Sequence, residues 1–192
     1  MYVALGDSFT AGTEPGQPRW PDELARELGG DYVNLAEVGA TSEDVERGQL
    51  QAALELRPDV VTLVCGANDV LFSTRPDSDA YAARLGRMFA RLRRELPNVE
   101  LVTATYPDIA RFLDLRPRTR ARVEEGMRHF NAAVRRVARL HNVVLMESFD
   151  HPEAGKRAIY ADDGFHPSEE GHRAAAREFM RALRKRLRIR PA

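Results

Sequence analysis

Three residues of this sequence have side chains that could act together as a nucleophilic site. Ser8 follows Gly6 and Asp7 near the N-terminus, and Asp163 precedes His166 by three positions near the other end. A serine becomes a strong nucleophile when a histidine takes its proton and a carboxylate orients that histidine. On a loop, a three-residue separation lets Asp163 fold back onto the Nδ1–H of His166 and leave Nε2 facing the serine. The residue types therefore fit acyl transfer.

Each of these features also has a simpler interpretation. By itself, the spacing of Asp163 and His166 is better explained by a surface aspartate near a helix start, beside an exposed histidine. Ser8 could be an ordinary turn residue with Asp7 as a local cap. A phosphate-binding loop is a further alternative, but no Gly-Lys-Ser/Thr follows, and the glycine spacing matches no dinucleotide fingerprint. The chemistry depends on whether the fold brings these residues together.

Gly39 and Asn68 are two further candidates, because each follows directly on a predicted strand. The missing side chain of Gly39 would let its backbone N–H approach a ligand closely. The side-chain amide of Asn68, in Gly66-Ala67-Asn68-Asp69, could donate a hydrogen bond into the same space. As single features they are equally typical of a turn glycine and a capping residue.

Short apolar runs alternate with longer amphipathic stretches, which predicts an α/β fold with a parallel sheet. We expect strands over residues 2–5, 32–35, 60–64, 99–104 and 143–146. We expect helices over residues 20–28, 42–56, 79–96, 117–141 and 168–187, with Ser42 and Ser168 as N-caps of the second and last. The pattern predicts a doubly wound, three-layer sandwich with all of residues 1–192 in one domain.

Polar, glycine-containing segments follow three of these strands, at residues 6–12, 37–41 and 66–69. In open α/β sheets, ligands bind at the carboxyl ends of the strands, so these segments should meet at one edge. Residues 162–166 connect the last strand to the last helix and can reach the same edge. The sequence therefore predicts that Ser8, Gly39, Asn68, Asp163 and His166 form one site.

These four segments, in this order, resemble the SGNH/GDSL hydrolase family over nearly the whole chain. The matching motifs are Gly6-Asp7-Ser8-Phe9, Asn34 through Gly39, Gly66-Ala67-Asn68-Asp69 and Asp163-Gly164-Phe165-His166-Pro167. Phe9 stands where the family often carries leucine or isoleucine. The resemblance implies a flavodoxin-like α/β/α sandwich of five parallel strands, and an esterase that needs no cofactor.

The resemblance also implies a role for each matching residue. Ser8 would be the nucleophile, His166 the general base and acid, and Asp163 the orienting carboxylate. The backbone N–H groups of Ser8 and Gly39 and the side chain of Asn68 would form the oxyanion hole. We expect Asp7 and Asp69, which complete their motifs, to hold loops in place rather than react.

The substrate class follows only coarsely from this resemblance. The family accepts small-molecule esters of several kinds, including acetylated sugars, lipids, thioesters and aryl esters. Because the sequence has no inserted lid or second domain, we expect an open, shallow site that takes short acyl groups. Residues 106–115 form the longest irregular stretch, which could be either a flap that walls the acyl pocket or a plain loop or short helix packed on the core.

Composition excludes several other classes. Among 192 residues, 29 basic and 29 acidic side chains cancel to a formal charge of zero, so we expect no binding to nucleic acid through a global field. We interpret Arg173–Arg190, with Phe179, Met180, Leu183 and Leu187 at helical spacing, as an amphipathic helix with a basic solvated face, not a membrane contact. No apolar run has the length of a membrane span.

The remaining candidates for chemistry are weaker. Cys65, the single cysteine, fits a small buried hydrophobe better than a second nucleophile, and it cannot form an internal disulfide. The histidines at positions 129, 141, 151 and 172 share no metal-ligand spacing, so we expect no metal. With no signal peptide in the sequence as given, we expect a cytoplasmic protein.

Two rival functions use the same fold. A non-catalytic module could bind a ligand in the edge crevice. A receiver-like domain could accept a phosphoryl group on Asp7, but the sequence lacks a paired acidic cluster after the first strand and a lysine after the last. The hydrolase hypothesis uses all four motifs, and neither rival does.

Overall fold

Five strands run parallel to one another in the order β2-β1-β3-β4-β5. The computed structural model describes residues 1–189 of the chain. The strands are β1 (Tyr2–Gly6), β2 (Tyr32–Asn34), β3 (Val60–Val64), β4 (Glu100–Ala104) and β5 (Val144–Met146). This is the flavodoxin-like strand order, so the predicted fold class is confirmed.

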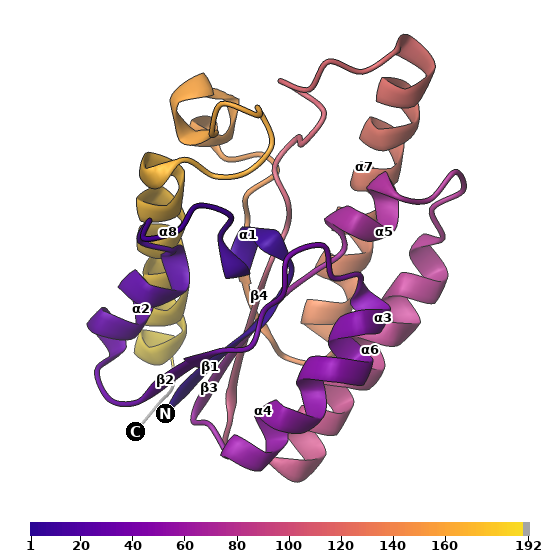
Figure 1. Ribbon diagram of the computed structural model, residues 1–192. Coiled ribbons are helices and arrows are strands. Elements are labelled where there is room, and N and C mark those ends of the chain that lie inside the picture. Colours follow the sequence, from indigo (N-terminus) through magenta and orange to yellow (C-terminus); the bar gives the residue numbers. More distant parts are fainter. Residues whose placement is uncertain (190–192) are drawn as a thin grey trace.

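Helices cover both faces of the sheet (Figure 1). One layer holds α2 (Trp20–Leu28) and α8 (Glu169–Ile189), and the other holds α4 (Leu50–Leu56), α6 (Ser78–Glu95) and α7 (Pro117–Leu140). Shorter segments are α1 (Ser8–Ala11), α3 (Ser42–Asp44), the π-helical turn η1 (Val45–Gln49), α5 (Ala67–Leu71), and the 3-10 turns η2 (Pro152–Gly155) and η3 (Arg157–Ile159).

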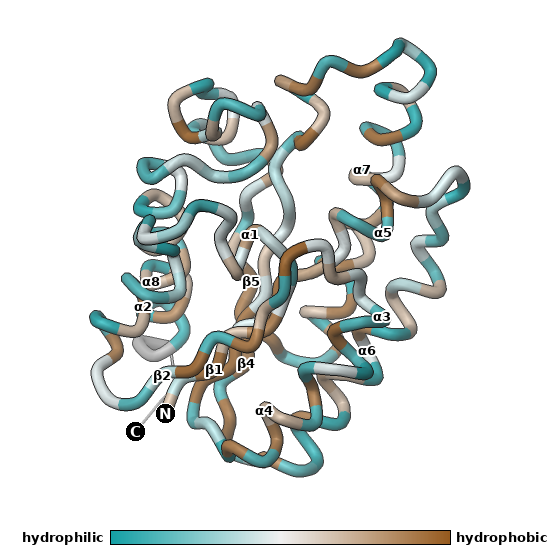
Figure 2. The backbone as a smooth tube through the Cα atoms, in the orientation of Figure 1, coloured by the Kyte–Doolittle hydropathy of each residue, from teal (hydrophilic) through white to brown (hydrophobic). Residues whose placement is uncertain are grey.

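The core lies on both sides of the central strands. Every residue of β1 and β4 is buried, and Figure 2 shows the apolar colour concentrated along the strands and on one side of the helices. In one layer Trp20 of α2 stacks on Phe179 of α8 with ring centroids 4.1 Å apart. In the other, Tyr81 of α6 stacks on Phe130 of α7 at 4.4 Å. Burial of these apolar surfaces is the main stabilising contribution to the sandwich.

The predicted boundaries of the strands and of most helices agree with the structure to within two residues. The prediction for residues 42–56 was wrong in two respects. Thr41, not Ser42, is the N-cap, since its hydroxyl accepts the Asp44 N–H while the Asp44 carboxylate accepts the Thr41 N–H. The helix is also interrupted by η1, which widens one turn before α4 begins.

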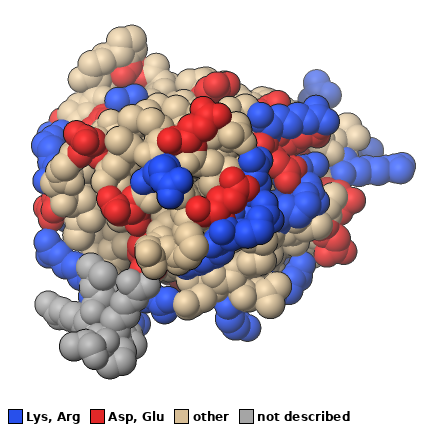
Figure 3. All heavy atoms as spheres, turned by 90° about the horizontal axis from the view of Figure 1, so that it is seen from below, with Lys and Arg blue, Asp and Glu red and all other residues tan. Residues whose placement is uncertain are grey.

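Charges of both signs are mixed on the face seen in Figure 3. On α8, Phe179, Met180 and Leu183 are buried while Arg173 and Arg177 are exposed, which confirms the predicted amphipathic helix over that stretch. The side chain of Leu187 and all of Arg190 lie outside the described part of the chain. Within residues 1–189, no helix combines the length and the apolar character that a membrane span requires.

Candidate active site

Ser8 lies at the first position of α1, directly after β1. Asp7 caps this turn, and its Oδ1 accepts the N–H of Phe9 at 3.0 Å. Gly12, with φ +77°, ends it. This short helix was not among the helices expected from the sequence, because four residues are too few to show a hydrophobic period. The cap holds Ser8 at the carboxyl edge of the sheet, where its side chain is almost fully buried.

Glycine is required at position 6, where the end of β1 lies against the backbone of β3. A Cβ atom at Gly6, which has φ +152°, would lie 2.2 Å from the backbone oxygen of Val64 in β3. The buried side chain of Gln49 forms two hydrogen bonds with the backbone of Gly6, donating to its oxygen at 2.9 Å and accepting its N–H at 2.8 Å. Gln49 is the last residue of η1, and π-helical turns frequently occur at functional sites. It therefore fixes the end of β1 just before the turn that carries Ser8.

The structure brings Ser8, His166 and Asp163 into one chain of contacts. His166 Nε2 lies 3.0 Å from Ser8 Oγ, and His166 Nδ1 lies 2.6 Å from Asp163 Oδ2. Asp163 Oδ1 also accepts the N–H groups of Phe165 and His166, at 2.8 and 3.0 Å. Partial burial raises the pKa of Asp163, but these hydrogen bonds outweigh it, and the pKa lies below its ordinary value. The Asp163 carboxylate is thus ionised at neutral pH and faces Nδ1.

The loop around His166 is fixed at both ends. Gly164 has φ +71°, and a Cβ atom there would lie 2.7 Å from the backbone oxygen of Phe112. Ser168 caps α8 as predicted, since its Oγ accepts the N–H of Gly171. The same hydroxyl donates to the backbone oxygen of Ala158 at 2.6 Å. These contacts limit the movement of the imidazole relative to α8.

Gly39 and Asn68 lie on segments that contact each other. Gly39 has φ +82° in the turn after β2, and Asn68 is the second residue of α5. The buried Asn68 Nδ2 donates to the backbone oxygen of Ala40 at 2.9 Å. An amide nitrogen carries two hydrogens, so this bond leaves one for a ligand. The Gly39 segment also runs beside β1, where the N–H of Glu37 donates to Gly6.

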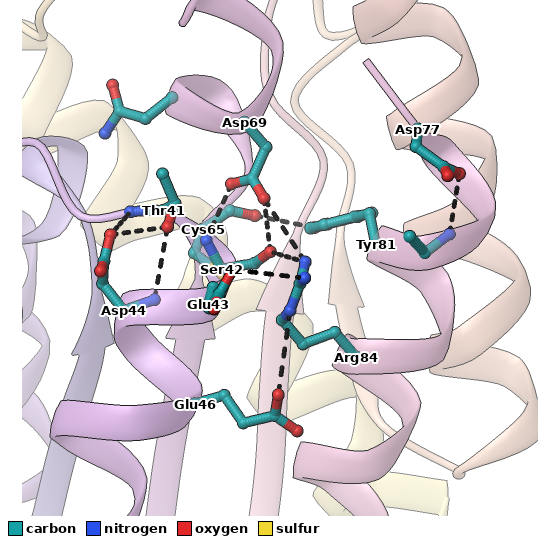
Figure 4. A network of polar contacts seen from close by, with 12 residues as sticks. Thr41, Ser42, Glu43, Asp44, Glu46, Cys65, Asp69, Asp77, Tyr81 and Arg84 are labelled. Atoms are coloured by element: carbon teal, nitrogen blue, oxygen red, sulfur yellow. Dashed lines mark hydrogen bonds and ion pairs between the residues drawn. The ribbon is translucent and has the colours of Figure 1, made fainter. Parts of the chain in front are cut away.

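An ion-pair and hydrogen-bond network ties these two segments together (Figure 4). Asp69 accepts the backbone N–H of Ser42 at 2.8 Å and its hydroxyl at 2.5 Å. Arg84 of α6 donates to Ser42 Oγ at 2.9 Å and lies 3.8 Å from Asp69. This use of the Ser42 hydroxyl explains why Ser42 does not cap its own helix. The contacts agree with the expectation that Asp69 holds a loop.

Comparison with known families identifies the chain. The model of the GDSL-like lipase/acylhydrolase family matches residues 4–174, a span that includes Ser8, Gly39, Asn68, Asp163 and His166. The chain belongs to this family. Its predicted resemblance to GDSL hydrolases is therefore confirmed. A comparison with curated proteins gave no match.

Solved structures share the fold of this GDSL-family chain. A GDSL-like protein from Parabacteroides merdae superposes with a TM-score of 0.80 at 17% identity, covering 94% of both chains. A lipase/acylhydrolase from Enterococcus faecalis gives 0.74 at 24% identity, covering 96% of both. A catalytic serine-to-alanine mutant of an acetylxylan esterase from Geobacillus stearothermophilus gives 0.75 at 20% identity, covering 95% of this chain and 93% of that one.

Asp7 and Tyr106 form a buried contact that the sequence did not indicate. The Tyr106 hydroxyl donates to Asp7 Oδ2 at 2.5 Å. Burial raises the pKa of Asp7 to about 7, against the hydrogen bonds from Tyr106 and the Phe9 N–H, which lower it. In the sequence, Gln49 and Tyr106 are polar residues next to apolar positions. Such positions are too common to mark either residue as part of the site. Asp7 nevertheless caps a turn, as expected.

An aromatic cluster packs beneath the imidazole. Phe9 meets the rings of Tyr106 and Phe165 edge-on, with centroids 5.1 and 5.0 Å away, and Phe165 meets His166 at 4.5 Å. Phe9 and Tyr106 also border a cavity of about 120 Å³, whose largely apolar lining further includes Trp20, Met146, Tyr160 and Phe179. Neither Ser8 nor His166 lines this cavity.

The residues set aside as nucleophile or ligand have structural surroundings. Cys65 is buried at the end of β3, and burial raises the pKa of its thiol, which leaves it unreactive. His172 is buried on α8, and its Nδ1 accepts the N–H of Trp20 at 3.2 Å. Within residues 1–189 no group of histidine, cysteine, aspartate or glutamate side chains has the arrangement of a metal site.

Residues 106–115 form a loop packed on the core, which was one of the two predicted alternatives. Ile109 and Ala110 are fully buried. Arg120 of α7 donates to the backbone oxygens of Ala110 and Leu113. These contacts anchor the loop.

Proposed function

We propose that this GDSL-family protein hydrolyses small-molecule carboxylic esters through an acyl-enzyme on Ser8. The observation that carries the proposal is the continuous contact from Ser8 Oγ to His166 Nε2 at 3.0 Å and from His166 Nδ1 to Asp163 at 2.6 Å. Membership in a family of lipases and acylhydrolases supports the same reaction class.

The first half of the reaction transfers the acyl group to the serine. With Nδ1–H donated to Asp163, His166 Nε2 accepts the Ser8 hydroxyl proton while Oγ attacks the ester carbonyl carbon. The tetrahedral intermediate then collapses as the bond to the alcohol oxygen breaks. The protonated imidazole returns its proton to that oxygen, and the alcohol leaves. Asp163 stays ionised throughout and stabilises the imidazolium.

Three donors are available for the oxyanion. Ser8 is the first residue of α1, where a backbone N–H has no acceptor inside the helix. The N–H of Gly39 and the second hydrogen of Asn68 Nδ2 come from the two segments that the Asp69 network ties together. Fixed donors of this kind stabilise the charge that develops on the carbonyl oxygen without reorganising during the reaction.

Water completes the cycle in the second half. His166 Nε2 takes a proton from water, and the hydroxide oxygen attacks the acyl carbon. The second tetrahedral intermediate collapses as the bond between Ser8 Oγ and the acyl carbon breaks, and the imidazolium returns its proton to Ser8 Oγ, which releases the carboxylic acid. Each cycle consumes one ester and one water and releases one alcohol and one acid. His166 carries each proton that is transferred.

We further propose that the acyl group is short. The side chains of His166 and Asp163 are 19% and 48% exposed, so this part of the triad faces solvent, while Ser8 itself is buried. The apolar cavity described above is lined by neither Ser8 nor His166, and chain-length preference rests on apolar burial at about 0.8 kcal/mol per methylene group, so a long chain would gain little here.

A panel of p-nitrophenyl esters with acyl groups of two to twelve carbons tests this function. We expect turnover of the acetyl and butyryl esters and a fall in kcat/KM for longer chains. Ser8→Ala should lose this turnover while keeping the thermal unfolding transition of the unmodified protein. A folded protein that turns over none of the esters would contradict the proposed function, and a preference for the longest chain would contradict the short acyl group.

A further inference from the structure

Asp7 is a fully buried carboxylic acid next to the nucleophile. Its two oxygens have different partners: Oδ1 accepts the N–H of Phe9 inside the α1 turn, and Oδ2 accepts the hydroxyl of Tyr106 at 2.5 Å. Its backbone oxygen accepts two further N–H groups of the same turn. Asp7 therefore connects the conformation of the Ser8 turn to a side chain from the end of β4.

Tyr106 is itself held in a defined position. Its backbone N–H donates to Asn131 Oδ1 at 2.9 Å, and its backbone oxygen accepts Asn131 Nδ2 at 2.9 Å. Asn131 is fully buried on α7. The Tyr106 ring packs edge-on against Phe9. Both the backbone and the ring of Tyr106 are thus fixed before its hydroxyl reaches Asp7.

The surroundings of Asp7 make the Tyr106 hydroxyl costly to lose. Four titratable groups interact with the Asp7 carboxyl by hydrogen bonding or by charge: Tyr106 after β4, Cys65 after β3, Asp69 on α5 and Tyr81 on α6. All four are acids, so none of them offers Asp7 a positive charge. Without the hydroxyl, Oδ2 would be a buried acceptor with no donor, a condition that structures avoid by rearranging. The four-residue turn that Asp7 caps is bonded directly to this residue, so a change at Oδ2 acts on that turn first.

We propose that Tyr106 is a positioning residue for the proposed hydrolysis, acting through Asp7 to keep the α1 turn in the conformation in which Ser8 Oγ meets His166 Nε2. The inference rests on the proposed function, because it concerns the alignment of the same nucleophile. It assigns no contact between Tyr106 and the substrate. Its action is confined to kcat and leaves substrate binding unchanged.

Tyr106→Phe is the direct test, and Tyr2→Phe is its matched control. Both substitutions remove one buried tyrosine hydroxyl. The Tyr2 hydroxyl forms a hydrogen bond with the Thr62 hydroxyl at 2.8 Å. Tyr2 begins β1, at the opposite end of the strand from Ser8. We expect Tyr106→Phe to lower kcat about 10- to 100-fold, as small misplacements of reacting groups do, with KM changed less than about twofold. Tyr2→Phe should retain the kcat of the unmodified protein.

A double-mutant cycle separates positioning from general destabilisation. Asp7→Ala should also lower kcat, and combining it with Tyr106→Phe should add no further loss, because both act through one contact. Independent losses that multiply would overturn the proposal, as would a Tyr106→Phe variant with the kcat of Tyr2→Phe. If Tyr106→Phe fails to fold, the comparison of Asp7→Ala with Asp7→Asn decides. The amide can keep both contacts, so Asp7→Asn should have the higher kcat, and equal values would overturn the proposal.

Failure of the proposed function gives a different result from failure of this inference. An unmodified protein without esterase activity would overturn the proposed function, and the positioning role with it. An active protein in which Tyr106→Phe matches its control would overturn the positioning role alone. A further readout does not depend on turnover: the Asp7 carboxyl, followed by ¹³C NMR, should titrate at higher pH in Tyr106→Phe than in Tyr2→Phe.

Discussion

His166 Nε2 lies 3.0 Å from Ser8 Oγ, although 158 positions separate the two residues in the chain. Each is placed by contacts of its own neighbourhood. Asp7 and Gln49 fix the Ser8 turn from the side of β1, and Asp163 and the Ser168 cap fix the His166 loop on α8. The contact therefore forms because two separately stabilised loops meet at one edge of the sheet.

Asn68 should act as an oxyanion donor as well as a link between loops. Asn68→Ala removes the donor, and we expect kcat to fall about 100-fold or more. Asn34→Ala is the control, since Asn34 Nδ2 also ties a loop near Ser8 by donating to the backbone oxygen of Thr10, at 3.0 Å. Steady-state kinetics on an acetyl ester should show a much larger loss for Asn68→Ala. Equal losses would mean that Asn68 serves only as a link.

Arg84 should support catalysis at a distance, through Asp69 and Ser42. Arg84→Met removes the cation beside this network, so the Gly39 and Asn68 segments lose part of their mutual alignment. We expect kcat to fall between about threefold and tenfold. Arg87→Met is the matched control, because Arg87 lies on the same helix and pairs with Glu46 at the exposed surface. A kcat for Arg84→Met equal to that of Arg87→Met would contradict this role.

Two buried groups should give opposite pH dependences of stability. Burial lowers the pKa of His172 to about 4, from 6.5. Between these values the unfolded chain binds more protons at this position, so His172 makes stability rise with pH. Burial raises the pKa of Asp7 from 3.8 to about 7. In that interval the folded protein binds more protons at Asp7, which makes stability fall as pH rises.

Urea unfolding at pH 4.5, 5.2 and 6.0 should separate the two contributions. Relative to the unmodified protein, the stability of His172→Asn should slope downward with rising pH and that of Asp7→Asn upward. Each difference in slope is bounded by about 1.4 kcal/mol per pH unit, the limit for one proton. Parallel stability curves for either variant and the unmodified protein would show that the replaced group does not titrate differently in the two states.

Most of the fold was predictable because it depends on local patterns. The run at Val60–Val64 is apolar except for Thr62, as expected of a strand buried on both faces, and the spacing of Asp163 and His166 lies within one loop. Gln49 and Tyr106 could not be predicted, since their partners Gly6 and Asp7 are 43 and 99 positions away. Thr41 and Ser42 are both good N-cap residues, but Thr41 has the reciprocal contacts with Asp44, and the Ser42 hydroxyl bonds the distant Asp69 instead.

Covalent labelling with a fluorophosphonate probe, mapped by mass spectrometry, tests directly whether His166 activates Ser8 as a nucleophile. We predict one label per chain on Ser8, no label in Ser8→Ala, and a labelling rate reduced by orders of magnitude in His166→Ala, because the imidazole activates the hydroxyl. A folded protein that remains unlabelled, or that labels at Ser8 equally fast without His166, would contradict this prediction.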